Sequence, residues 1–180
     1  MNFGGIDISA INPIPEIETK DEKEVFAFFG LASFNAQCAE KSLVNFVMGY
    51  KLLDESALTQ DEWLVLYNNL NSKTFGQLLG QVKKHIEISQ ELIDSLQSTL
   101  KNRNWLAHDF FYDYAIEFSD SKGRHVMICK LQELIKQFQL ADRAVESLNL
   151  NVWSKFGVTE EWIQNQIASD IENYQNTESA

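Results

Sequence analysis

The chain of 180 residues is poor in proline, and this scarcity narrows its fold class. Both prolines, Pro13 and Pro15, lie in the first 20 residues. No proline follows them that would break a helix. Runs with the alternating pattern of strands are also scarce. We therefore expect an all-α domain.

Cysteine and long apolar runs are scarce as well. The two cysteines, Cys38 and Cys129, lie in apolar helical stretches, which is typical of buried free thiols in a reducing compartment. A disulfide or metal-binding pair is the alternative. No run approaches the 18 apolar residues that a membrane span requires, and the N-terminus lacks a basic segment followed by an apolar one. The sequence thus predicts a cytoplasmic protein with neither membrane anchor nor signal peptide.

Basic residues are outnumbered, and the net charge is −11. This charge argues against a protein that coats nucleic acid through bulk electrostatics. The charge is uneven, because residues 73–108 hold five basic and three acidic side chains, a net charge of +2. From Glu160 onward there are five acids and no base. A mildly basic patch on an acidic body is compatible with a local phosphate site.

The pattern of apolar residues predicts three segments. Residues 1–20 lack helical periodicity and are expected to form an extended or poorly ordered arm. Residues 21–157 are expected to form an antiparallel helical bundle of four to five long helices plus short ones. Residues 158–180 are expected to form an acidic C-terminal helix and tail.

Several helix boundaries follow from capping side chains. We expect helices from Asp21 to about Leu53, over 59–70, from Thr74 and from Ser89. The first of these is apolar around most of its girth, with Asn35, Gln37 and Glu40 as polar exceptions. The cleanest apolar pattern, with strict 4,3 spacing typical of a bundle seam, is formed by Met127, Leu131, Leu134, Phe138, Ala141, Val145 and Leu148.

The segment 101–111 is the candidate functional site, because it places one of three arginines five residues before one of three histidines. On a straight helix two such residues differ by about 140° in direction. Arg103 and His108 can converge if Arg103 lies in the first turn of a helix that Asn102 or Asn104 caps. We therefore predict a loop-to-helix junction here, followed by an aromatic helix through about Phe118.

These residue types can cleave RNA without a metal ion. An imidazole transfers protons near neutral pH, and a guanidinium binds a phosphate and offsets the charge that develops on it. RNA supplies its own nucleophile, the 2′-hydroxyl. We assign Arg103, Asn104 and His108 as catalytic candidates. The substrate-binding candidates are Lys101, Lys83 and Lys84, which are basic, and Trp105, which could stack on a base.

Structural explanations of the same residues stay open. Arg103 could cap a helix C-terminus or pair with Asp94 or Asp109, and His108 could be a satisfied core histidine. Lys83 and Lys84 complement a helix dipole in the last turn of a helix. Neither a Gly-rich phosphate loop nor a Glu-x-x-His pair occurs, so we predict no cofactor and no metal.

The motif Arg103-Asn104-x-x-x-His108, late in an all-helical chain with a long first helix, resembles that of the HEPN superfamily. The signature of that family is Arg, a polar residue, and His after four to six intervening residues. Residues 29–40 and 74–78 also look like bacterial HEPN-like proteins of unassigned role. The likeness covers roughly residues 22–150.

The resemblance implies a metal-independent endoribonuclease that works as a homodimer, in settings such as toxin–antitoxin systems and phage defence. Arg103 would bind the scissile phosphate, His108 would be the general acid and base, and Asn104 would support them. Some toxin members carry a Tyr two residues after the His, where a nucleotide modification is attached. Here that residue is Phe110, which argues against control by an antitoxin of that kind.

Two functions therefore remain as hypotheses. The first is a dimeric ribonuclease with RNA as substrate and an antitoxin or other protein as partner. The alternative is a non-catalytic dimeric helical module that binds a nucleotide or a protein.

Overall fold

The computed structural model describes residues 11–54 and 58–178, and within these ranges all regular structure is helical. The prediction of an all-α fold is confirmed. Two single-turn 3-10 helices, Glu117–Ser119 and Ser154–Phe156, interrupt the loops. The α-helices are α1 (Glu22–Asp54), α2 (Gln60–Asn71), α3 (Phe75–His85), α4 (Gln90–His108), α5 (Phe110–Asp113), α6 (Ser121–Trp153) and α7 (Glu160–Glu178).

The predicted capping side chains start most of these helices. The hydroxyl of Thr59 accepts a hydrogen bond from the Glu62 N–H at 3.4 Å, and the Glu62 carboxylate accepts one from the Thr59 N–H at 2.9 Å. Thr74 and Gln77 form the same reciprocal pair at the start of α3. These bonds satisfy amides that the first turn of a helix leaves free, which is why the helix starts agree with the sequence.

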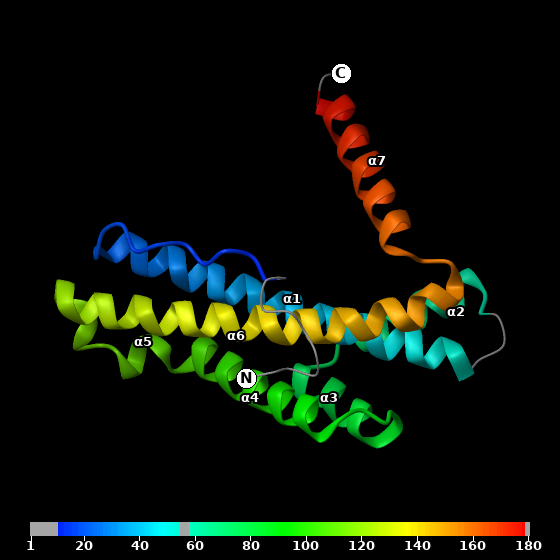
Figure 1. The fold of residues 1–180 in the computed structure, drawn as a ribbon, viewed down its shortest axis with the longest axis horizontal. Helices are drawn as coiled ribbons and strands as arrows, with labels where there is room; N and C mark the ends of the chain where they lie inside the picture. Colours follow the sequence, from blue (N-terminus) through cyan, green and yellow to red (C-terminus); the bar gives the residue numbers. More distant parts are fainter. Residues whose placement is uncertain (1–10, 55–57, 179–180) are drawn as a thin grey trace.

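Helices α1 and α6, each of 33 residues, pack along their whole length and form the axis of the molecule (Figure 1). Hydrogen bonds join Arg124 to the carbonyl of Lys20 just before α1, Ser42 to Asp142, and Trp153 to the Asn45 carbonyl. The residue numbers of both partners rise together, so the two helices run parallel.

The antiparallel bundle is therefore wrong for this central pair. Helices α2 to α5 form a long connection that returns the chain to the end where α1 began, so α6 starts beside the start of α1 (Figure 1). Within this connection α4 runs opposite to both long helices. Its early residue Leu96 packs with their C-terminal halves, whereas Leu106 packs with their N-terminal halves.

The core consists of two clusters along this axis. One holds Phe75 and the C-terminal halves of α1 and α6, and the other holds Phe110, Phe138 and their N-terminal halves. The second half of the axis is tight, because a Cβ added at Gly49 would lie 2.8 Å from Nε1 of Trp153. The glycine thus lets α1 and α6 approach closely.

Residues 11–20 contain neither helix nor strand and lie against the second cluster through Ile14 and Ile17. The Pro15 carbonyl accepts a hydrogen bond from Nε2 of Gln132 at 2.8 Å. The described part of the predicted arm is thus laid on the helical body. Its first ten residues lie outside the described residues.

Helix α7 projects away from the body on the side opposite to α3 and α4 (Figure 1). No helix in the described ranges is both long and apolar enough to cross a membrane. Cys38 and Cys129 are free and partly buried.

Candidate functional site

The motif residues lie inside a continuous helix. Helix α4 begins at Gln90, capped by Ser89, and continues through Arg103 to His108. The prediction of a loop-to-helix junction at Arg103 is therefore wrong, as is the long aromatic helix after it. Helix α5 is a single turn, Phe110–Asp113.

Packing and a hydrogen bond to α6 explain why the helix continues through the motif. Leu106 is buried in the second cluster, and Thr99 is buried as well, so packing holds the segment between them in helical register. Asn102 lies inside α4 and caps no helix, and its Nδ2 donates to Oε1 of Gln137 on α6 at 2.5 Å. Side-chain contacts with α6 thus replace the expected cap.

Arg103 points toward α1. Its Nη2 donates to Oε2 of Glu40 at 3.0 Å, and its Nη1 donates to Oδ1 of Asn104 at 3.2 Å. The two side chains of the ion pair are 33% and 17% exposed, so Arg103 is held in place while part of it faces water. The partner is Glu40, and neither Asp94 nor Asp109, which the sequence had suggested, takes this position.

His108 is more exposed than Arg103. It is the last residue of α4, its side chain faces solvent, and within the described ranges it makes neither a hydrogen bond nor an ion pair. The core-histidine interpretation is therefore wrong. An imidazole in this position can exchange protons with solvent or with a bound molecule.

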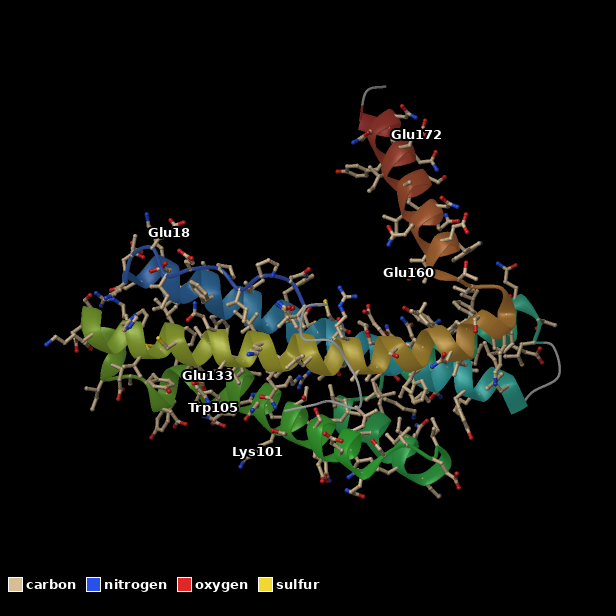
Figure 2. The ribbon with its side chains drawn as sticks, in the orientation of Figure 1. Glu18, Lys101, Trp105, Glu133, Glu160 and Glu172 are labelled. Carbon is tan, nitrogen blue, oxygen red and sulfur yellow. The ribbon has the colours of Figure 1, made fainter. Side chains whose placement is uncertain are left out.

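His108 shares its face of the helix with two other predicted site residues. Lys101, Asn104 and His108 follow one another at spacings of three and four residues, and all three are exposed. Figure 2 shows Lys101 directed away from the body on α4. We call these three residues the α4 motif face.

Arg103 does not lie on this face. Because both residues sit in one regular helix, Arg103 and His108 differ by about 140° in direction and by roughly 7.5 Å along the axis. Within one chain, Lys101, Asn104 and His108 therefore form the α4 motif face. Arg103 lies at the edge of this face and is connected to it by its hydrogen bond to Asn104. One chain alone does not aim the arginine and the histidine at one point.

Trp105 belongs to the rim of the second cluster. Its ring meets those of Phe110 and Tyr114 edge to face, at centroid distances of 5.4 and 6.0 Å, and its Nε1 donates to Oδ2 of Asp113 at 2.6 Å. Burial raises the pKa of the neighbouring Tyr114 phenol. These contacts give the indole a structural role, and a stacked base would reach only its exposed part.

Lys83 and Lys84 are exposed in the last turn of α3. They lie near the start of α4, and the motif lies near its end, roughly 16 Å further along the axis. The structure therefore separates these lysines from the α4 motif face. In the described ranges no group of three or more His, Cys, Asp or Glu side chains is placed to hold a metal ion.

Glu40 is the residue whose importance the sequence did not reveal. Its only signal was that it is one of the polar residues in the largely apolar middle of α1, and the sequence alone could not pair it with a residue 63 positions away. Asn35, a second polar exception, has a local explanation, because its Nδ2 donates to the Leu31 carbonyl at 2.8 Å.

Comparison of the chain with protein-family models, with curated proteins and with solved structures finds no match.

Proposed function

We propose that this protein is a metal-independent endoribonuclease of HEPN type whose active site is completed by a second copy of the chain. The observation that carries the proposal is the exposed His108, which has no partner among the described residues and lies on one face with Asn104 and Lys101, while Glu40 holds Arg103 at the edge of that face. Exposed histidine, amide and lysine side chains on one helix face can bind a phosphodiester and transfer protons to and from it.

The reaction uses only groups of the protein and the RNA. His108 removes the proton of the 2′-hydroxyl, and the resulting oxygen attacks the adjacent phosphorus. The P–O5′ bond breaks, the leaving O5′ takes the proton from the imidazolium, and a 2′,3′-cyclic phosphate remains. Arg103 offsets the negative charge on the phosphoryl oxygens, and Asn104 orients the guanidinium to which it is bonded.

A second copy is needed because Arg103 and His108 diverge on their helix. Two α4 motif faces that meet around a two-fold axis would bring the histidine of one chain toward the edge of the other face, where Arg103 is bonded to Asn104. This homodimer is part of the proposal, as are RNA as the substrate and a role in a toxin–antitoxin system or in phage defence.

The first test is cleavage of single-stranded RNA in EDTA, with DNA of the same sequence as the substrate that lacks the nucleophile. We expect His108→Ala and Arg103→Ala each to slow cleavage at least about 100-fold. Gln97→Ala, which alters an exposed residue one turn before Lys101, is the matched control and should cleave like the wild type. Equal cleavage by His108→Ala and wild type would contradict the proposal.

The variant Glu40→Gln tests whether the role of Arg103 is catalytic or structural. If Arg103 only pairs with Glu40, removal of either charge has the same consequence. If Arg103 binds the phosphate, Arg103→Ala abolishes cleavage whereas Glu40→Gln retains it, because the guanidinium remains. Thermal unfolding of both variants shows whether the lost ion pair has affected the fold.

Mixing the two inactive variants tests the shared site. In a heterodimer of Arg103→Ala and His108→Ala chains, one of the two composite sites keeps both functional side chains. Cleavage should therefore return on mixing. A mixture that stays inactive, while wild-type activity is present, would place each site within one chain.

A second candidate, the non-catalytic dimeric module, is favoured by the Arg103–Glu40 ion pair and by the net charge of −11. A guanidinium that already has a carboxylate partner must exchange it to bind phosphate. This function predicts a stable dimer that cleaves no RNA and that binds a nucleotide or a protein.

A further inference from the structure

Helix α7 carries an apolar stripe that nothing in the described structure covers beyond its first residue. Ile163, Ile167 and Ile171 recur every four residues and therefore lie on one side of the helix. Ile167 is 47% exposed and Ile171 is 53% exposed, and every described side chain from residue 164 to 177 faces solvent. We call Ile163, Ile167 and Ile171 the α7 stripe.

The stripe begins in a groove at the base of α7. This groove has a volume of about 530 Å³ and lies between α7, α6 and the middle of α1. Ile163, the first residue of the stripe, lines it, so the groove and the stripe form one continuous surface. Its other apolar lining residues are Leu150, Trp153, Val158 and Trp162.

A residue that lines the groove, Asn149, has a buried acceptor that no described donor reaches. Nδ2 of Asn149 donates to the Ser42 carbonyl at 3.0 Å, but its Oδ1 is buried and accepts no hydrogen bond from the described residues. Buried acceptors of this kind are normally satisfied. Asn149 lines the groove through its other atoms, because Oδ1 itself has no exposed surface.

The charges along this surface are negative. Glu160 lines the groove, and Asp170 lies within about 20° of Ile163 on the helix, so acids border the stripe. From Glu160 to the end of the chain there is no basic residue. Figure 2 shows Glu160 at the base of α7 and Glu172 toward its far end. The groove residue Arg143 is already paired with Glu146 at 2.7 Å.

We propose that the groove and the α7 stripe together bind a basic amphipathic helix of a partner protein. The apolar side of such a helix would cover the stripe, and its Lys or Arg side chains would meet Glu160 and Asp170. Trp153 and Trp162 could receive a cationic side chain in the groove. This mode of recognition, an amphipathic helix held by an apolar surface, needs anchors at helical spacing, which the stripe provides.

The charges disfavour the two other ways to cover the stripe. Two copies of α7 packed through their stripes would bring Asp170 and Glu160 of both chains together, with no base on either helix to offset them. The chain's own net-positive stretch, residues 73–108, lies on the other side of the α1–α6 pair (Figure 1). A partner of opposite charge fits the surface better than either.

The test uses the full-length protein and a fluorescein-labelled peptide of about the length of α7. The peptide has leucines at helical spacing on one side and lysines elsewhere. A scrambled peptide of the same composition is the control for general charge attraction. We expect fluorescence anisotropy to show saturable binding of the amphipathic peptide that is at least about tenfold tighter than that of the scrambled one.

Paired variants locate the binding surface. Ile167→Gln/Ile171→Gln removes the stripe, whereas Asn165→Gln/Ser169→Gln places two glutamines on the opposite side of the same helix. We expect the first variant to bind at least about tenfold more weakly and the second to bind like the wild type. Circular dichroism checks that both keep their helical content.

A second pair tests the charges. Glu160→Gln/Asp170→Asn should weaken binding and its salt dependence more than Glu161→Gln/Glu172→Gln, which neutralises the same number of acids on the opposite side. Equal effects of the two pairs, or equal binding by the stripe variant and wild type, would overturn the proposal.

The remaining outcomes concern the competing occupants. A free protein that sediments as a dimer, and that Ile167→Gln/Ile171→Gln alone converts to monomer, would assign the stripe to a second copy and overturn the proposal. If that variant unfolds at a lower temperature than its opposite-side control, the stripe packs against the rest of the same chain. This outcome would also overturn the proposal. The ribonuclease proposal stands or falls separately, because it rests on α4.

Discussion

Helices α6 and α7 begin in the same way and end up in opposite environments. Asp120 accepts hydrogen bonds from the N–H groups of Lys122 and Gly123 at the start of α6, and Thr159 accepts one from Trp162 in the first turn of α7. Both helices carry apolar side chains at spacings of three and four residues. The apolar side of α6 is buried against α1 and α4, whereas that of α7 faces solvent beyond its first turn.

The difference shows that periodicity determines which side of a helix is apolar but not what covers it. Helix α6 has partners within the chain on two sides, so its apolar side chains contribute to folding stability. Helix α7 leaves the body after Gly157, whose φ of 81° is a conformation that favours glycine and ends the preceding turn. Its apolar side chains remain available for another molecule.

The largest expected effect contrasts a core residue of α6 with a stripe residue of α7. Phe138 is fully buried, so Phe138→Ala should lower the free energy of unfolding by about 3–5 kcal/mol through lost burial and a cavity. Ile171→Ala should lower it by less than about 0.5 kcal/mol, because half of its side chain already faces water. Urea denaturation followed by circular dichroism measures both. Similar losses in the two variants would mean that the α7 stripe is covered in the free protein.

The sequence predicted the α6 side of this comparison well. Of the seven residues with strict 4,3 spacing, six are buried and Leu148 is partly buried. Capping residues and apolar spacing act within a few residues of one another, so a sequence displays them directly. The parallel course of α1 and α6 depends instead on how a connection of several helices folds back, and no local pattern encodes it.

The residues of the candidate site stay a prediction, and the structure bears only on how they are arranged. The exposed Lys101, Asn104 and His108 do gather on one face, because their spacing is local. The direction of Arg103 was missed, since its ion pair with Glu40 forms only when α4 packs beside α1. Trp105 was considered for base stacking, and its bond to Asp113 emerged only with the sharp turn after His108.

A smaller effect concerns a carboxyl group that is buried only because α6 is covered. Burial raises the pKa of Asp142 above its ordinary value of 3.8, and the hydrogen bond from Ser42 offsets part of this rise. A raised pKa in the folded state means that ionisation costs stability. This cost is absent at pH values below the unfolded pKa and grows as the pH rises through the folded pKa.

We therefore expect Asp142→Asn to stabilise the protein at neutral pH and to lose this advantage in acid. The asparagine Oδ1 can still accept the Ser42 hydroxyl, which bonds to Asp142 Oδ1 at 2.5 Å. Asp120→Asn is the control of opposite sign, because hydrogen bonds from the N–H groups of Gly123 and Lys122 lower the pKa of Asp120. The stability that this ionised cap contributes is present above its unfolded pKa and is lost as the pH falls. Urea denaturation across the acidic range gives the difference in free energy of unfolding between each variant and the wild type. We expect this difference to change with pH in opposite directions for the two variants. The same pH dependence in both would contradict the burial of Asp142.

The smallest expected effect is that of removing α7. A chain that ends at Val158 keeps α1 to α6 with all residues of the two core clusters. Because the side chains of α7 beyond Ile163 face solvent, we expect its unfolding temperature to stay within a few degrees of the full chain's. The helical signal should fall in proportion to the residues lost, and the labelled peptide should no longer bind. A large fall in unfolding temperature would instead show that α7 packs on the body in solution. The apolar side chains of α7 would then be covered within the chain, as those of α6 are, only less completely.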